Sequence, residues 1–203
     1  MAIGPRRAQH GHRAGHARAA AATPSMNAGL SMSAAGRQTL ATREGQGGGA
    51  ANLGGHYDDS ANNCTVGVGI LVHHGPCTAA ELAQRADANA NDTEFNRRVH
   101  RAESAVRNGV NARQLNQNQF DALVSASFNS GNQLDPALIA ANTNNDTAVA
   151  VHLRQLVMVH NHDAHGHMVG PPTLSRGLVN RRAGEITQYN TQISPVTPGV
   201  PRR

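Results

Sequence analysis

Residues 33–74 carry the clearest local pattern in the chain and read SAAGRQTLATRE (33–44), GQGGGAANLGG (45–55) and HYDDSANNCTVGVGILVHH (56–74). The first piece predicts a helix from about Ser33 to Glu44, because Ser is a favoured N-cap residue and Gly45 suits the position after a helix end. The third piece mixes β-branched residues with glycines behind a polar turn, which predicts a small hairpin or meander. The glycine-rich piece joins the two.

Polar residues mark the start of three further helices. Thr78-Ala-Ala-Glu81 has the pattern of a capping box, in which hydroxyl and carboxylate satisfy each other's free backbone donors. Asp92 is expected to cap a second helix and Asn116 a third, which Gly131 ends. The two longer helices each present one apolar face, made of Phe95, Val99, Ala102 and Val106 in one and of Phe120, Leu123, Val124 and Phe128 in the other.

The remaining elements complete an α+β protein. Further helices are expected at 136–142, 147–159 and 175–189. One early helix, a small β element and a mainly helical body are the arrangement that this order predicts. The core must be aliphatic, because only 2% of the residues are aromatic and none is Trp.

Length and composition predict one folded domain with a tail at each end. The chain has 203 residues, and single domains mostly hold about 100–200. Residues 1–32 are basic and show no sustained apolar period, which is typical of a disordered tail. Residues 191–203 are rich in proline and cannot continue a helix. The folded domain is therefore expected to span 33–190.

Charge and hydropathy narrow the function classes. All 18 basic residues are Arg, and 13 acidic residues leave a net charge of +5. A positive surface favours an anionic partner, such as nucleic acid, anionic lipid or bacterial cell-wall polymer. No apolar run approaches the roughly 20 residues that span a bilayer, and the N-terminal segment lacks the apolar centre of a secretory signal. We therefore expect no membrane span and synthesis in the cytoplasm without an ordinary signal peptide.

Three blocks of sequence occur in the order found in one known family. The first contains SAAG (33–36), REG (43–45), YDD (57–59) and CTVGVG (64–69); the second contains NQFDALV (118–124) and FNSG (128–131); the third contains GLVNRR (177–182) and Glu185. Together they resemble the phage-type lysozymes, glycoside hydrolase family 24, which includes many endolysins. The resemblance implies a lysozyme-like fold over about 33–190, with a small β-hairpin subdomain joined to a mainly helical body.

Glycoside cleavage needs one protonated carboxylic acid and a second, ionised carboxylate. The resemblance assigns these roles to Glu44 and Asp59. It also implies that Thr65 holds the water that attacks the anomeric centre with inversion. The residues agree, since Glu44 ends a helix beside apolar Leu40 and Ala41, whereas Asp59 lies in a polar turn. Each also has a structural explanation, because turn aspartates accept backbone hydrogen bonds and threonines are common in strands.

Two departures from the family pattern are visible. Fourteen residues separate Glu44 from Asp59, against about eight in the typical motif. A surface insertion costs little closure entropy, so we expect the two carboxylates still to meet. Ile70 occupies the position where the family usually has His, which affects a supporting contact. By the same resemblance, Leu71 and Phe128 line the sugar cleft; both are equally explained as core residues.

Several other polar groups need an explanation. Arg181 and Arg182 are expected to form an ion-pair network or the rim of the cleft. Cys64 and Cys77 flank the hairpin, and they are expected to be bridged in an oxidising compartment and buried thiols otherwise. The segment HNHDAHGH (160–167) offers metal-ligand chemistry, but it lacks the spacing of reliable zinc motifs and is expected to be a solvated loop. We therefore predict no metal and no cofactor.

The sequence thus predicts a muramidase that cleaves the β-1,4 bond between N-acetylmuramic acid and N-acetylglucosamine in peptidoglycan. We expect a monomer that acts in the periplasm or on the cell wall, as a phage endolysin released through a holin or as an antibacterial effector delivered by a secretion apparatus. The competing hypothesis is a degenerate lysozyme-fold module that binds wall polymer or nucleic acid through its Arg/His-rich tail. No specific nucleic acid is expected, because the chain lacks an aromatic platform for bases.

Overall fold

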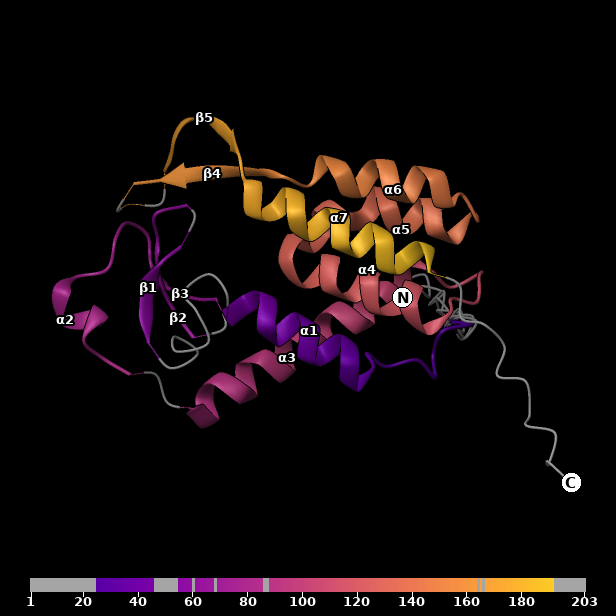
Figure 1. Cartoon of the computed structure of the whole chain (residues 1–203), viewed down its shortest axis with the longest axis horizontal. Coiled ribbons are helices and arrows are strands. Elements are labelled where there is room, and N and C mark those ends of the chain that lie inside the picture. The colour runs from indigo at the N-terminus through magenta and orange to yellow at the C-terminus, as the bar shows by residue number, and fades with distance from the viewer. Residues whose placement is uncertain are drawn as a thin grey trace, which may run out of the picture.

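The computed structural model describes residues 25–45, 55–59, 61–67, 69–85, 88–163, 165 and 167–191 (Figure 1). Its elements follow in the order α1 (Ala34–Gly45), β1 (His56–Asp58), β2 (Cys64–Val66), β3 (Ile70–His73), α2 (Ala79–Leu82), α3 (Ala88–Gly109), α4 (Gln117–Ser130), the 3₁₀ helix η2 (Gly131–Leu134), α5 (Asp135–Asn142), α6 (Asp146–Gln155), β4 (Met158–His162), β5 (Met168–Leu174) and α7 (Arg176–Asn190). The three-stranded sheet lies at one end of the molecule and the helical body at the other, with α1 and α3 extending between them. The predicted α+β fold is confirmed.

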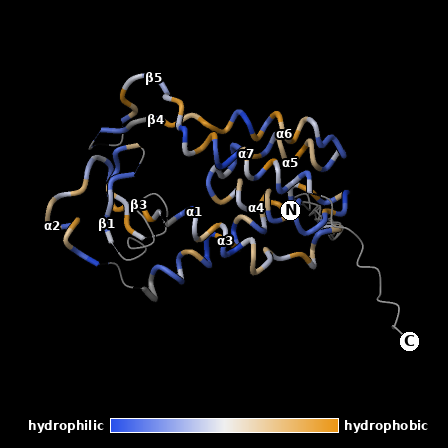
Figure 2. Tube along the Cα trace, viewed as in Figure 1, coloured by the Kyte–Doolittle hydropathy of each residue, from blue (hydrophilic) through white to orange (hydrophobic). Residues whose placement is uncertain are grey.

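Helix α4 is the centre of the helical body. It begins at the predicted N-cap Asn116, whose side chain forms a capping box with Gln119, and it ends at Gly131. Its apolar residues Phe120, Leu123 and Val124 are fully buried, and α3 and α7 pack against it. The core is mostly aliphatic, as the composition predicts, and apolar and polar residues alternate along the surrounding helices (Figure 2).

Helix α3 begins earlier than the sequence predicts. Asp92 was expected to cap it, but the helix starts at Ala88 and Asp92 lies inside it. Alanine has the highest helix propensity, so the first turn can form ahead of the favoured cap residue. The predicted apolar face is confirmed, because Val99, Ala102 and Val106 are buried and Phe95 packs against the core.

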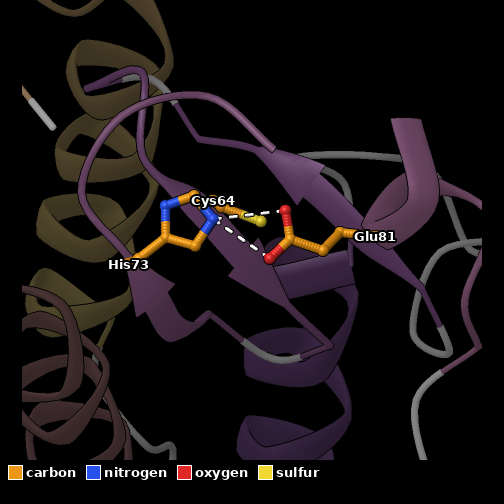
Figure 3. A group of neighbouring side chains, drawn as sticks. All are labelled: Cys64, His73 and Glu81. Carbon is orange, nitrogen blue, oxygen red and sulfur yellow. Dashed lines mark hydrogen bonds and ion pairs between the residues drawn. The ribbon is translucent and has the colours of Figure 1, made fainter. Parts of the chain in front are cut away.

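The first sheet is an antiparallel meander in the order β1-β2-β3. Thr65 pairs with Tyr57 on one side and with Leu71 on the other, and the register shifts between Cys64 and Thr65. A hydrogen bond from the ring of His73 to Glu81 joins this sheet to α2 (Figure 3). The capping box predicted at the start of α2 is present. The meander therefore matches the β element expected after the glycine-rich segment.

A second sheet was not predicted. The helix expected over 147–159 ends at Gln155, and the antiparallel strands β4 and β5 follow it. Residues 160–162 of the expected loop belong to β4, and its described residues Asp163, His165 and His167 lie between the two strands. Residues 156–159 read LVMV, a short apolar run that fits a buried helix turn and a strand equally well. The hairpin lies close to the end of the first sheet, because the ring of His162 is 5.2 Å, between centroids, from that of His74, which follows β3.

The expected boundary of the N-terminal tail at residue 32 is wrong for the segment 25–32. Asn27 is fully buried, and its side-chain amide donates to the carbonyl oxygens of Val110 and Arg113 at 2.6 and 2.8 Å. Its Oδ1 accepts from the backbone N–H of Leu115 at 2.8 Å. A single asparagine thus joins this segment to the α3–α4 connection, a contact that hydropathy cannot reveal. Thr191, the first residue of the expected C-terminal tail, is the C-cap of α7. Residues 1–24 and 192–203 of the two expected tails lie outside the described part of the chain.

Among the described residues, no helix combines the length and the apolar character needed to cross a membrane.

Candidate active site

A cavity of about 790 Å³ lies between the first sheet and the helical body. Its wall includes all three residues that the sequence singles out for chemistry, Glu44, Asp59 and Thr65. They come from the last turn of α1, the turn after β1 and strand β2. The first two turns of α7 also contribute to the wall. Asn129 of the second block lines the cavity as well, so residues of all three sequence blocks share it.

Glu44 is held by an ion pair across this cavity. Its Oε1 lies 2.6 Å from Nη1 of Arg181 in α7, and the two side chains are only 12% and 10% exposed. The guanidinium of Arg181 also donates to Glu185 Oε1 and to the carbonyl oxygen of Ser125, both at 3.2 Å. The sequence analysis expected apolar surroundings for Glu44. The structure places a charged network there instead, because Leu40 turns into the core and Glu44 faces α7.

The network continues to Glu185, which is completely buried. Glu185 accepts a hydrogen bond of 2.6 Å from the hydroxyl of Ser125 and pairs with Arg182 at 3.1 Å. Arg43 lies 3.8 Å away on the other side. Burial lowers the pKa of the Arg182 guanidinium, while the charge of Glu185 opposes that change. The expected ion-pair network of Arg181 and Arg182 is thus present, and it fixes α7 against α4 and α1.

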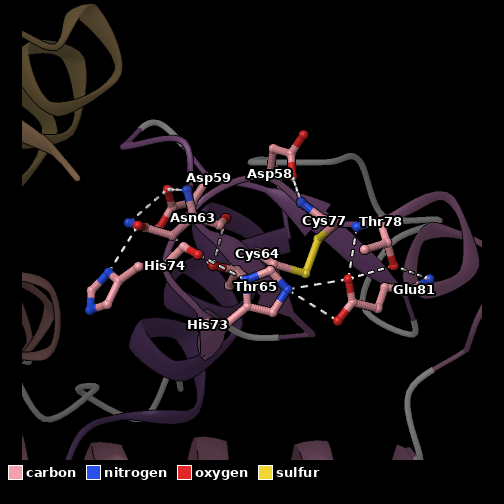
Figure 4. Close-up of a disulfide and its surroundings, with 10 residues drawn as sticks. All are labelled: Asp58, Asp59, Asn63, Cys64, Thr65, His73, His74, Cys77, Thr78 and Glu81. Carbon is pink, nitrogen blue, oxygen red and sulfur yellow. Dashed lines mark hydrogen bonds and ion pairs between the residues drawn. A yellow bond between two sulfur atoms is a disulfide. The ribbon is translucent and has the colours of Figure 1, made fainter. Parts of the chain in front are cut away.

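Asp59 is oriented by its own turn (Figure 4). Oδ1 accepts hydrogen bonds from the backbone N–H groups of Ala61 and Asn63 at 2.8 and 2.9 Å. Oδ2 faces Thr65, whose hydroxyl donates to it at 3.4 Å. Thr65 is nearly fully buried beside the register shift in β2. One carboxylate oxygen is therefore fixed by the backbone, and the other is directed to the threonine.

Asp58 has a different role from its neighbour. Its Oδ1 accepts the backbone N–H of Cys77 at 2.6 Å, and Cys77 is joined to Cys64 by a disulfide (Figure 4). Asp58 therefore connects β1 to the segment before α2. The bridge, which the sequence left open, ties that same segment to β2.

Three residues that the sequence analysis did not single out complete the cavity near Glu44: Tyr57, Gly69 and Arg98. Gly69 has φ +84°, and a Cβ there would lie 3.3 Å from Arg98 Nη1 and 3.8 Å from Glu44 Oε2. Burial raises the pKa of the Tyr57 hydroxyl, and the charges of Glu44 and Asp59 raise it further. Tyr57 therefore stays a neutral hydrogen-bond donor. Tyr57 adjoins the Asp pair in sequence, but only the tertiary fold reveals Arg98.

The two residues expected to line the sugar cleft, Leu71 and Phe128, are not on the wall of this cavity. Leu71 is 49% exposed on β3, and Phe128 is buried. The Phe128 ring lies 4.3 Å beneath the guanidinium of Arg98, which donates to the carbonyl oxygen of Gly69 at 2.9 Å. Phe128 thus supports the cavity from below. Ile70, at the position where the resemblance expects His, pairs with Val66 in the sheet.

A helical body joined to a small sheet, with two carboxylates and a threonine on one cavity wall, defines a lysozyme-like protein. The sequence profile described as phage lysozyme matches residues 53–185, and the chain therefore belongs to that family. A comparison with the sequences of curated proteins finds no match.

Solved structures with the same fold include an endolysin from Escherichia coli O157:H7 phage FAHEc1, which is 24% identical, with 82% of this chain and 98% of that chain covered and a TM-score of 0.61. The muramidase domain of SpmX from Asticaccaulis excentricus is also 24% identical, with 79% and 98% covered and a TM-score of 0.57. A mutant of P22 lysozyme is 22% identical, with 80% and 99% covered and a TM-score of 0.51. At these identities the likeness shows the fold.

Proposed function

We propose that the chain is a muramidase that hydrolyses the β-1,4 bond between N-acetylmuramic acid and N-acetylglucosamine in peptidoglycan, with inversion. Membership of the phage lysozyme family supports this class of enzyme and substrate. The observation that carries the proposal is the shared cavity wall of Glu44, Asp59 and Thr65. Two carboxylates and a water between them are the groups that inverting glycoside hydrolysis needs.

Glu44 is the general acid. Arg181 holds Oε1 at 2.6 Å, while Oε2 lies on the side of Gly69, where the absence of a side chain leaves room. The proton leaves Oε2 for the glycosidic oxygen, which departs as a hydroxyl. Arg181 thus keeps the second oxygen of the carboxyl group directed to the substrate.

Asp59 is the general base, and Thr65 positions the water. The hydroxyl of Thr65 and Oδ2 of Asp59 lie 3.4 Å apart, and both can hydrogen-bond one water molecule. That water attacks the anomeric carbon from the face opposite the leaving group and gives a proton to Asp59. Glu44 loses one proton and Asp59 gains one, so the protons balance. One water is consumed for each bond cleaved, and proton exchange then returns both carboxyl groups to their starting states.

The net positive charge of the chain suits an anionic wall polymer. The cavity wall carries both signs, with Arg43, Arg98 and Arg181 beside Glu44, Asp58 and Asp59, and the excess of +5 belongs to the chain as a whole. The positive charge fits the anionic substrate. The proposed enzyme acts as a monomer, in the periplasm or on the wall, after release through a holin or a secretion apparatus.

Analysis of the fragments that the protein releases from purified murein sacculi tests the proposal. Mass spectrometry of the released fragments is expected to show muramic acid at the reducing end. Proton NMR at early times is expected to show the α-anomer of that new reducing end. Asp59→Asn is expected to reduce the rate of fragment release by at least about 100-fold, and Thr65→Ala by at least about 10-fold. Fragments that end in N-acetylglucosamine, or a first-formed β-anomer, would contradict the bond or the inversion. Sacculi left intact by the wild-type protein would support the competing binding module.

A further inference from the structure

Four metal-binding side chains meet at the end of the first sheet that faces α2. We call them the thiol cluster: Cys64, His73, Cys77 and Glu81. Cys64, His73 and Glu81 each offer one ligand atom, and these three atoms lie within 4.8 Å of one another (Figure 3). Cys77 belongs to the cluster because its sulfur is bonded to that of Cys64. The cavity described above does not include these side chains.

The ring of His73 is already oriented as a metal ligand. Its Nδ1 lies 2.9 Å from the carbonyl oxygen of His74. Because a carbonyl oxygen can only accept, Nδ1 carries the hydrogen of this bond, and a metal-binding histidine typically makes such a bond with its other nitrogen. Nε2 then points at Glu81 Oε1 and Oε2, 3.1 and 3.2 Å away. A proton or a cation must lie between Nε2 and the carboxylate.

The carboxylate of Glu81 is oriented as well. Its Oε2 accepts from the backbone N–H and the hydroxyl of Thr78 at 2.7 and 2.8 Å, as part of the capping box of α2. Oε1 has His73 as its partner. Tetrahedral zinc with bonds of about 2.0 Å sets nitrogen and oxygen ligands about 3.3 Å apart, close to the 3.1 Å observed between Nε2 and Oε1. The spacing of these two ligands therefore fits a zinc ion without rearrangement.

We propose that the reduced form of this protein binds one Zn²⁺ ion at the thiol cluster. Two thiolates, one imidazole and one carboxylate are ligands that zinc accepts in a closed tetrahedral site. The disulfide and the zinc ion exclude each other, because bonded sulfur atoms carry no negative charge. The cluster thus has two alternative crosslinks, one for a reducing and one for an oxidising compartment.

The interconversion balances with a dithiol as the reductant. Thiol–disulfide exchange breaks the bond between Cys64 and Cys77, gives two cysteine thiols and converts the dithiol into a disulfide. Zn²⁺ then displaces the two thiol protons, which pass to the buffer. Either crosslink closes the segment between β2 and α2, where Cys77 also donates to Asp58. Zinc can therefore replace the disulfide in holding this segment before oxidation.

Titration of the full chain with Zn²⁺ alone, in competition with a chromophoric chelator, tests the proposal. The protein is compared oxidised and after reduction with a phosphine that is then removed without air. We expect one Zn²⁺ per reduced chain, bound at least about 100-fold more tightly than by the oxidised chain. Equal affinity of the two forms, or more than one tight ion per reduced chain with none at the cluster, would overturn the proposal.

Variants identify the ligands. Glu81→Gln keeps the capping box, since Gln serves at that position as well as Glu, and it is expected to weaken zinc at least 10-fold in the reduced chain. His73→Ala is expected to do the same. His100→Gln is the matched control, because His100 pairs with Glu103 at 3.2 Å on α3 without a cysteine. His165→Gln controls for the exposed histidines of the second hairpin. Unchanged affinity in His73→Ala, or a loss in His100→Gln, would overturn the assignment.

Cobalt provides a measurement that does not depend on variants folding. Co²⁺ added to the reduced wild-type chain is expected to show the strong thiolate charge-transfer absorption and the visible bands of a tetrahedral site, and Zn²⁺ is expected to remove both. A spectrum of six-coordinate cobalt without charge transfer would show that the cysteines are not ligands and would refute the proposal.

Discussion

Nη1 of Arg181 lies 2.6 Å from Oε1 of Glu44, although 137 positions separate the two residues in the chain. This ion pair joins the last turn of α1 to α7 across the cavity. It fixes Oε1 of the carboxyl group while Oε2 lies on the side of Gly69, and it connects Glu44 to the buried carboxylate of Glu185 through the same guanidinium.

Arg181→Ala is expected to lower both activity and stability. Loss of one partner leaves the largely buried Glu44 and Glu185 with fewer counter-charges, and such changes cost about 3 kcal/mol. Chemical unfolding measures this cost, and sacculus clearing measures the rate. Arg181→Lys is expected to restore charge but not the fork of hydrogen bonds, and so to recover stability only in part. Wild-type stability of Arg181→Ala would show that the network is not a structural connection.

Gly69→Ala is expected to lower the clearing rate by more than its loss of stability explains. The new methyl group would lie beside Glu44 and Arg98 in the cavity, and the left-handed backbone costs about 1–2 kcal/mol. Gly170→Ala is the matched control, because Gly170 has φ +72° with open space where Cβ would lie. Similar loss of activity in both variants would mean that backbone strain, and not the space beside Glu44, limits the rate.

Asn27→Ala is expected to destabilise the protein by about 1–3 kcal/mol, the cost of leaving buried backbone groups unpaired. Three hydrogen bonds of its side chain are lost at the α3–α4 connection. Asn132→Ala, at an exposed position of η2, serves as the control and should stay within about 0.5 kcal/mol of the wild type. Equal midpoints of the two variants in urea would place the segment 25–32 outside the cooperative unit.

The stability of the protein at acid pH is expected to depend on Asp146. A hydrogen bond from Arg113, and a weaker contribution from Tyr189, hold the pKa of Asp146 below its usual range. Because the pKa is lower in the folded state, the stabilisation is present above the unfolded value of about 3.9 and disappears as pH falls through the folded value.

Melting temperatures from pH 6 down to pH 2 measure this dependence. Asp146→Asn is expected to flatten the acid side of the curve, and Arg113→Met to do likewise by removing the partner. An acid limb that stays as steep as in the wild type in both variants would assign the pH dependence to other carboxylates.

Local signals predicted much of the fold. Ser33 accepts the N–H of Gly36 at the start of α1, and the capping boxes at Thr78 and Asn116 are formed, because these contacts join residues three positions apart. The second hairpin was missed because LVMV fits two structures. Asn27 was missed because its partners lie more than 80 positions away.

The sequence brought Glu44, Asp59 and Thr65 together in one candidate site, but it did not predict their surroundings. The resemblance singled out Asp59 and Thr65 within one segment, and their contact spans only six positions. The charged surroundings of Glu44 depend on Arg181 in the last helix, and no local pattern links the two. Leu71 was placed on the cleft by resemblance alone, and it lies exposed on β3.

The clearing of murein sacculi by Glu44→Gln tests the central claim most directly. Gln keeps the size of Glu and can still accept from Arg181, but it has no proton to give to the leaving oxygen. We expect turbidity loss to slow by at least about 100-fold, while Glu94→Gln, a surface carboxylate paired with Arg97 on α3, clears like the wild type. Equal clearing by Glu44→Gln and the wild-type protein would contradict the assignment of Glu44 as the acid.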